Sequence, residues 1–254
     1  MPSGDLGRQI AAAGLAVQFL TRLPLPVRYS PEALAHAPRY FPLAGGLVGA
    51  VAAGVFWALS APLGGSVAAL LAIAAAGLLT GGLHEDGLAD LFDGLGGGRS
   101  AERALEIMRD SRIGSYGVLA LLLVVGLQVA LLVRLGPILG AAGLFAGHVV
   151  SRASMAVALT AGRYLRADGA GSGMAGPQGS VGIAVMVGLA ALGLLALPGA
   201  AVLPALAGVV VAHLVLRAWY GARLGGATGD CLGAQQQIGH VGLLLGVAIW
   251  QGAA

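Results

Sequence analysis

Seven long apolar runs, nearly free of charged residues, constrain this chain more than any other feature of its sequence. They fall at about residues 43–62, 66–83, 114–134, 138–160, 181–198, 200–216 and 238–252. Most approach the roughly 20 apolar residues that a helix needs to cross a bilayer. With 57% hydrophobic and only 10% charged residues, the chain has too much apolar surface for a soluble fold to bury. The sequence therefore predicts an all-α, polytopic membrane helix bundle with about seven transmembrane helices.

The chain is predicted to form a single integral membrane domain over residues 1–254, because no linker or change in composition divides it. Residues 1–42 precede the first run and form an N-terminal interfacial segment. Its apolar stretch from Ile10 to Leu20 is short and lacks an evident cleavage site, which favours an interfacial helix over a signal peptide. The 44 glycines are typical of membrane helices that pack closely.

Charged residues are distributed unequally between the two sides of such a bundle. With seven spans, one side receives the segments 1–42, 84–113, 161–180 and 217–237. That side holds all 11 acidic residues and, counting those at span ends, 13 of the 14 arginines; the exception is Arg134. Positively charged loops are retained in the cytoplasm, so this side is predicted to be cytoplasmic. The net charge of +3 gives no support for nucleic-acid binding.

Three aspartates in the cytoplasmic segment 84–113 share one face of a predicted helix. Asp86, Asp90 and Asp93 are spaced i, i+4 and i+7, which places them within an arc of roughly 60°. Their carboxylates repel one another unless a cation lies among them. Such hard oxygen ligands favour Mg²⁺, Mn²⁺ or Ca²⁺. The spacing therefore predicts a metal site, with a solvated acidic face as the alternative.

Other polar residues of this side are candidates for the same site. The run Arg109-Asp110-Ser111-Arg112 places two arginines around an aspartate, a pattern that suits phosphate binding beside a metal. Asp230 is a lone acid in a glycine-rich segment, and is either a second-site ligand or the N-cap of the last span. His84 is either a general base or ligand, or an interfacial anchor. Further positive charge comes from Arg163, Arg166, Arg217 and Arg223.

The segment after the aspartates contains three glycines and a predicted helix start. Ser100 is expected to be an N-cap, with Glu102 in the first turn of a short amphipathic helix. Glycines 96–98 are interpreted as a hinge, because no Gly-Lys-Ser/Thr follows them as in a phosphate loop.

Three long motifs follow one another along the chain. They are Gly-Leu-His-Glu-Asp-Gly-Leu-Ala-Asp-Leu-Phe-Asp-Gly at 82–94, Leu-Glu-Ile-Met-Arg-Asp-Ser-Arg-Ile-Gly at 105–114 and Gly-Gly-Ala-Thr-Gly-Asp-Cys-Leu-Gly-Ala at 225–234. With Phe-Leu-Thr-Arg-Leu-Pro at 19–24 and Tyr-Phe-Pro-Leu at 40–43, they resemble the cobalamin synthase family (adenosylcobinamide-GDP ribazoletransferase). The similarity covers nearly the whole chain in order.

The resemblance implies an enzyme that transfers the cobinamide-phosphate group of adenosylcobinamide-GDP to α-ribazole or its 5′-phosphate, releasing GMP and forming adenosylcobalamin or its phosphate. It implies Mg²⁺ as cofactor and a multi-pass protein of the bacterial inner membrane, with the active site facing the cytoplasm. The metal ligands it assigns here are Asp86, Asp90, Asp93, Asp110 and Asp230. The catalytic residues it assigns are His84, Asp86, Asp90, Arg109 and Arg112. The oligomeric state stays open, and a homo-oligomer is allowed.

The chain departs from the family pattern at three positions. Glu85 stands where the family usually has Leu, and Gln237 and His240 stand where members carry Glu. If either of those glutamates serves catalysis or metal binding, another residue must take that role here.

Two other classes of membrane protein fit the sequence less well. A CDP-alcohol phosphotransferase also uses spaced aspartates, but its signature breaks where Asp90 directly follows Ala89. A cation-coupled transporter would place ionisable groups near mid-bilayer, whereas here every acid lies outside the runs, on one side. The expected partners are therefore the two small-molecule substrates and the lipid bilayer, without nucleic acid.

Overall fold

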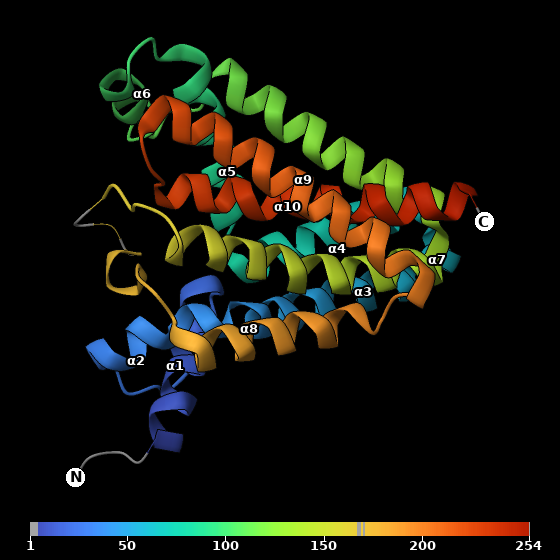
Figure 1. Cartoon of the computed structure of the whole chain (residues 1–254). Coiled ribbons are helices and arrows are strands. Elements are labelled where there is room, and N and C mark those ends of the chain that lie inside the picture. The colour runs from blue at the N-terminus through green and yellow to red at the C-terminus, as the bar shows by residue number, and fades with distance from the viewer. Residues whose placement is uncertain (1–4, 167–168, 170, 254) are drawn as a thin grey trace.

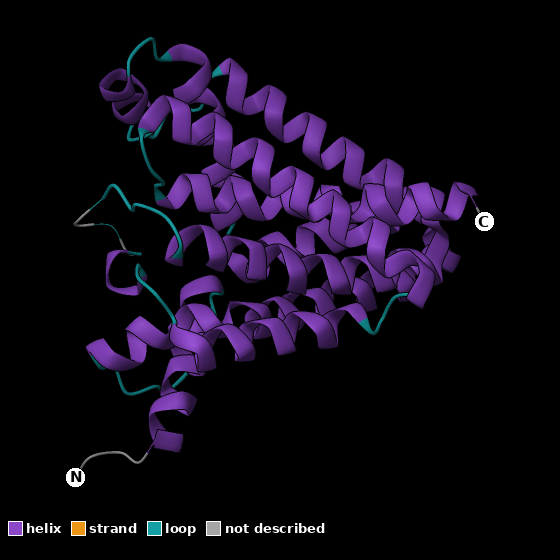
Figure 2. Ribbon diagram, viewed as in Figure 1, coloured by secondary structure: helices purple, strands orange, loops and turns teal. Residues whose placement is uncertain are grey.

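The computed structural model describes residues 5–166, 169 and 171–253, and these are helical nearly throughout (Figures 1 and 2). The α-helices are α1 (Asp5–Leu20), α2 (Pro31–His36), α3 (Phe41–Leu63), α4 (Gly65–Thr80), α5 (Leu83–Gly97), α6 (Ala101–Ile107), α7 (Ser115–Thr160), α8 (Gly179–Leu194), α9 (Gly199–Leu224) and α10 (Gly229–Ala253). Two short 3₁₀ helices are η1 (Ala37–Tyr40) and η2 (Ser172–Met174). The described residues form no strand beyond an isolated bridge between Tyr164 and Ala227. The all-α prediction is confirmed.

Three helical stretches of the described chain are long and apolar enough to cross a bilayer: Pro31–Leu63, Ser115–Thr160 and Gly199–Leu224. A fourth is reached when α4 and α5, which are bent by 93° at their junction, count together as one broken span. The chain is thus a helical membrane protein. The seven predicted runs do not all pass this test. α7 contains two runs in one element, α8 is shorter, and α10 is not among the stretches that pass.

The long helix α7 is interrupted where two predicted spans meet. Gly136 has φ 75° and ψ 176°, which is not helical, and Pro137 follows it. Figure 1 shows the two parts of α7 running in opposite directions between the two ends of the bundle. Gly136 therefore turns α7 into a helical hairpin.

The polar connections gather at one end of the bundle. In Figure 1, α2, α6 and the loop between α7 and α8 lie at the left, with the N-terminal helix. The C-terminal end of α10, the α8–α9 turn and the reversal of α7 lie at the opposite end. This arrangement matches the uneven distribution of charge in the sequence.

Glycines allow several helices to touch backbone to backbone. A Cβ on Gly208 of α9 would overlap the carbonyl of Gly242 of α10, and one on Gly246 would overlap that of Pro204. In the same way Gly45 of α3 lies against the carbonyl of His148 in α7. Close packing of this kind is what holds helices together in lipid, as the glycine content predicts.

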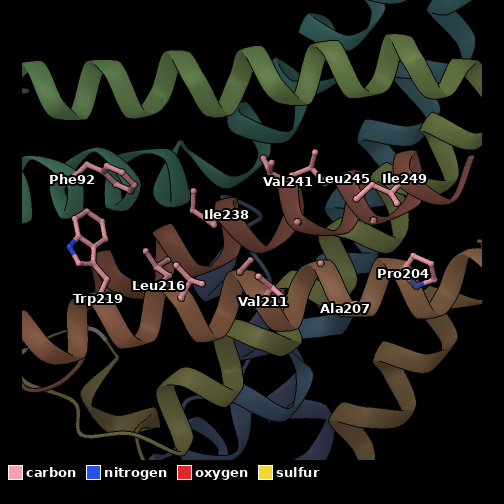
Figure 3. Close-up of a pocket in the computed structure, with 15 residues that line it drawn as sticks. Phe92, Pro204, Ala207, Val211, Leu216, Trp219, Ile238, Val241, Leu245 and Ile249 are labelled. Carbon is pink, nitrogen blue, oxygen red and sulfur yellow. The ribbon is translucent and has the colours of Figure 1, made fainter. Parts of the chain in front are cut away.

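An apolar groove of about 720 Å³ lies between α9 and α10 (Figure 3). Val211, Leu245 and Ile249 line it and are exposed. At one end Phe92 of α5 meets Trp219 edge-on, with ring centroids 5.2 Å apart. A continuous apolar surface of this size suits contact with hydrocarbon better than contact with water.

Candidate active site

The helix that carries the three aspartates is set by a sharp bend. Gly81 and Gly82 have φ of 72° and 73°, in the left-handed region that glycine adopts without strain. They allow α5 to leave α4 at 93°. As a result α5 does not continue along α4 but turns away from its axis.

The aspartates lie on α5 as their spacing predicts, but in three environments. Asp86 is exposed, Asp90 is half-buried and Asp93 is buried. Burial, followed by the charges of Asp86 and Asp230, raises the pKa of the Asp90 carboxyl to about 7. Negative charge around Asp90 is therefore only partly compensated in the absence of a cation.

Asp93 holds the start of α7 against α5. Its carboxylate accepts hydrogen bonds from the backbone N–H of Gly114 at 2.7 Å and of Gly117 at 2.8 Å. These N-terminal amides of α7 have no partner within their own helix. A Cβ at either glycine would collide with the carboxylate. Asp93 thus has an anchoring role that its helical spacing does not reveal.

The acidic stripe of α5 is formed by Asp86, Asp90 and Asp93. Asp230 lies close to this stripe because α5 and α10 cross in contact. A Cβ on Gly87 would lie 3.0 Å from Cα of Asp230, and one on Gly233 would lie 3.1 Å from the carbonyl of His84. A side chain at either position would have to push the facing backbone away by a few tenths of an ångström. The crossing places the charge of Asp230 within reach of Asp86 and Asp90.

Arg166 completes this group of charges. Its guanidinium forms a salt bridge with Asp230 at 2.8 Å, and the Thr228 hydroxyl donates to the same carboxylate oxygen at 3.3 Å. The loop that carries Arg166 is fixed next to α10 by a hydrogen bond from Leu165 N–H to the carbonyl of Ala227 at 2.9 Å. The sequence indicated Arg166 only as further positive charge, together with Arg163, Arg217 and Arg223, because nothing in its spacing relates it to Asp230.

The Arg109-Asp110-Ser111-Arg112 run lies apart from Asp90. All three charged residues are exposed in the connection between α6 and α7. Arg112 donates to Asp110 from Nε at 3.0 Å and from its terminal nitrogen at 2.6 Å, which lowers the pKa of Asp110 to about 2. Asp110 and Arg112 share a polar cavity with Asp93, so they adjoin the far end of the stripe.

His84 is buried at the crossing of α5 and α10. Burial and the charge of Arg152 hold its pKa well below the usual value, so the imidazole is neutral at pH 7 and a weak proton acceptor. Its Nε2 has no hydrogen-bond partner among the described residues.

The three departures from the family pattern lie near one another. Gln237 donates to Oε1 of Glu85 at 2.8 Å, and Gln128 of α7 donates to Oε1 of Gln237 at 3.0 Å. One turn along α10, the ring of His240 meets that of His148 edge-on, with centroids 4.5 Å apart. They form part of a buried polar layer between α5, α7 and α10.

The carboxylates of this region are the type of ligand that Mg²⁺ prefers, but few of them lie close together. Within the described chain, no three His, Cys, Asp or Glu side chains are close enough to hold a metal by themselves. Mg²⁺, however, usually takes one or two carboxylates and completes its shell with water and substrate phosphate oxygens. Asp86 and Asp90, one helical turn apart on α5, could supply two such carboxylates.

The fold and the site together define a polytopic helical membrane protein with an acidic, arginine-flanked site at one end of its bundle. The sequence matches the family model described as cobalamin-5-phosphate synthase over residues 12–248. The chain belongs to this family, as its motifs predict.

Curated relatives similar to this chain are named adenosylcobinamide-GDP ribazoletransferase. One from Bradyrhizobium diazoefficiens is 43% identical over 252 residues, or 95% of both chains. One from Shewanella amazonensis is 44% identical, covering 91% of this chain and 92% of its own. One from Shewanella baltica is 41% identical over 89% of each. No solved structure matches the chain.

Proposed function

We propose that this protein transfers the cobinamide-phosphate group of adenosylcobinamide-GDP to α-ribazole or its 5′-phosphate, with release of GMP. The names of the relatives support the substrates. The observation that supports the chemistry is the half-buried Asp90 between Asp86 and Asp230, with Arg166 against Asp230. Phosphoryl transfer needs positioning and charge neutralisation around the phosphates and little covalent work by the protein.

In the proposed reaction, a hydroxyl oxygen of α-ribazole forms a bond to the phosphorus on the cobinamide side of the diphosphate. The bond from that phosphorus to the oxygen of GMP breaks, and GMP leaves with the bonding electrons. The proton of the attacking hydroxyl passes to the leaving phosphate or to water. Mg²⁺, when held by Asp86 and Asp90 beside the charge of Asp230, would neutralise charge on the phosphate oxygens. Arg166 would bind the same oxygens in this proposal, which is supported by the position of its guanidinium against the Asp230 carboxylate.

Two of the expected metal ligands take other roles in this proposal. Asp93 is engaged by two backbone amides, and Asp110 is engaged by Arg112. We assign both to shaping the site and not to the metal. His84 is buried and weakly basic, so its role is to support the α5–α10 crossing instead of accepting the substrate proton.

The proposed topology has seven crossings of the bacterial inner membrane, formed by α3, α4, the two parts of α7, α8, α9 and α10. The reversal of α7 at Gly136 supports counting it twice. The concentration of arginine at the end that holds α5 and α6 supports a cytoplasmic site.

The test is GMP release by the full-length protein in membranes or proteoliposomes with Mg²⁺. The wild type should release GMP only when adenosylcobinamide-GDP and α-ribazole are both present. Asp90→Asn should lower the rate by at least about a hundredfold, since it removes a central oxygen ligand. Glu32→Gln, an exposed acid of α2 at the same end, is the control and should keep full activity. Release of GMP without α-ribazole, or full activity of Asp90→Asn, would contradict the proposal.

A further inference from the structure

A polar cavity of about 350 Å³ lies between α5, α6 and the start of α7, beyond the last aspartate of the stripe. Its volume is within the range of roughly 300–1,000 Å³ seen for small-molecule sites. Asp93 belongs both to its wall and to the acidic face of α5. The cavity is therefore next to the proposed catalytic group but outside it.

One wall of the cavity is the aromatic ring of Tyr116, which packs against the backbone of α5. A Cβ on Gly96 would come within 2.6–2.9 Å of three ring atoms of Tyr116, so the ring packs directly on the backbone of α5. Tyr116 is nevertheless 52% exposed. A ring supported on one side and open on the other is a suitable platform for stacking a planar base. Within the glycine run at 96–98, Gly96 makes this contact and Gly98 caps the end of α5.

Besides Asp93, the cavity has four charged side chains, and these form two exposed ion pairs. Arg103 pairs with Glu106 at 2.6 Å with side chains 59% and 68% exposed, and Arg112 pairs with Asp110 at 2.6 Å with 87% and 40% exposed. Exposed pairs contribute little to stability, so these groups can exchange partners when a ligand arrives. The contact with Arg103 uses only Oε2 of Glu106.

These groups match the chemistry of a guanine nucleotide. Guanine presents two adjacent donors, N1–H and its 2-amino group, which a carboxylate with two acceptor oxygens can receive together. Arginine binds phosphate oxygens through paired N–H donors. An aromatic platform, the carboxylate of Glu106 and two arginines supply a partner for each part of the nucleotide. The other two carboxylates of the cavity, Asp93 and Asp110, are engaged by backbone amides and by Arg112.

We infer that this cavity binds the guanosine monophosphate half of adenosylcobinamide-GDP, an inference that rests on the proposed function. The base stacks on Tyr116 and pairs with Glu106, and Arg103 and Arg112 bind the phosphate next to guanosine. The three-residue step along α5 from Asp93 to Asp90 rises about 4.5 Å, which is the scale of one diphosphate. The diphosphate then lies along α5 with its reacting phosphorus beside Asp86 and Asp90.

The experiment compares inhibition by GMP with inhibition by IMP, which lacks the 2-amino group. The variants are Glu106→Gln and Tyr116→Leu, with Glu102→Gln as control, because Glu102 is exposed on the same helix but does not line the cavity. Wild type and Glu102→Gln should bind GMP more tightly than IMP. Glu106→Gln should weaken GMP inhibition by about tenfold and abolish this preference, since it replaces a charged acceptor. The KM for adenosylcobinamide-GDP should rise with it, and the KM for α-ribazole should not.

Equilibrium dialysis of labelled GMP against the purified full-length protein gives the same comparison without turnover. A wild type that binds GMP in preference to IMP but transfers nothing would refute the proposed reaction while supporting the nucleotide site. Active Glu106→Gln and Tyr116→Leu variants with wild-type GMP affinity and preference would refute the nucleotide site and leave the reaction standing.

Discussion

Gln237 of α10 donates its side-chain amide to Glu85 of α5 at 2.8 Å. The sequence departs from the family pattern at both positions, and the structure shows that these two departures contact each other. Gln128 donates to the carbonyl oxygen of the same amide at 3.0 Å, so a single side chain connects α5, α7 and α10.

We therefore expect Gln237→Leu to destabilise the fold. The change leaves Oε1 of Glu85 and the amide of Gln128 without these partners in a largely buried layer, at a cost of about 2 kcal/mol or more. Thermal unfolding in detergent measures the loss. Gln251→Leu, which makes no such hydrogen bond on the same helix, is the control. The double change Glu85→Leu with Gln237→Leu should cost less than the two single changes combined, and strict additivity would argue against the coupling.

The dependence of activity on Mg²⁺ should change with pH near 7. Because burial and the charges of Asp86 and Asp230 raise the pKa of Asp90 to about 7, this carboxyl is mostly protonated at pH 6 and mostly ionised at pH 8. A proton must leave before a cation binds there. The Mg²⁺ concentration for half-maximal activity should therefore rise by up to about tenfold per pH unit below 7 and level off above 8. A constant value from pH 6 to pH 8 would contradict the assignment of Asp90.

Arg166 should be required for turnover. Arg166→Gln removes the cation that faces Asp230 and, in the proposed complex, the phosphates, so the transfer rate should fall by about a hundredfold or more. Arg166→Lys should recover part of it, because the charge returns without the planar guanidinium. Arg163→Gln changes an exposed side chain of the same loop and is the matched control. Equal rates for Arg166→Gln and Arg163→Gln would show that Arg166 is not required for the transfer.

The contact between α5 and α10 should set the geometry of the site. Gly87→Ala introduces a Cβ 3.0 Å from the backbone of Asp230, and backbone atoms cannot rotate away as a side chain can. The resulting shift of α5 should lower activity by about tenfold to a hundredfold, since displacements near 1 Å have effects of that size. Gly77→Ala in α4 meets nothing within 4 Å and should leave activity unchanged. An unaffected rate in folded Gly87→Ala would show that this spacing is not critical.

The sequence predicts local structure well in this protein because helical periodicity and capping are local properties. It places Asp86, Asp90 and Asp93 on one helix face, and it identifies Ser100 as the N-cap whose hydroxyl accepts from the N–H of Arg103 at 3.2 Å. It also identifies the reversal of the chain near Gly136.

The sequence does not predict contacts between distant segments. The spacing that puts Asp93 beside Asp90 cannot show that its oxygens are taken by Gly114 and Gly117. Nothing near Arg166 indicates that it pairs with Asp230, 64 residues later. A helical pattern defines a face, whereas the neighbour of that face depends on how the whole bundle packs.

The 93° bend at Gly81 and Gly82 also determines how deep the acids lie. On a helix along the membrane normal, Asp86 and Asp93 would differ in depth by about 10.5 Å. On a helix that lies across the end of the bundle, the aspartates share one level under the proposed topology. A large, highly charged diphosphate can then extend along α5 at the membrane–water boundary, and no part of it has to enter hydrocarbon.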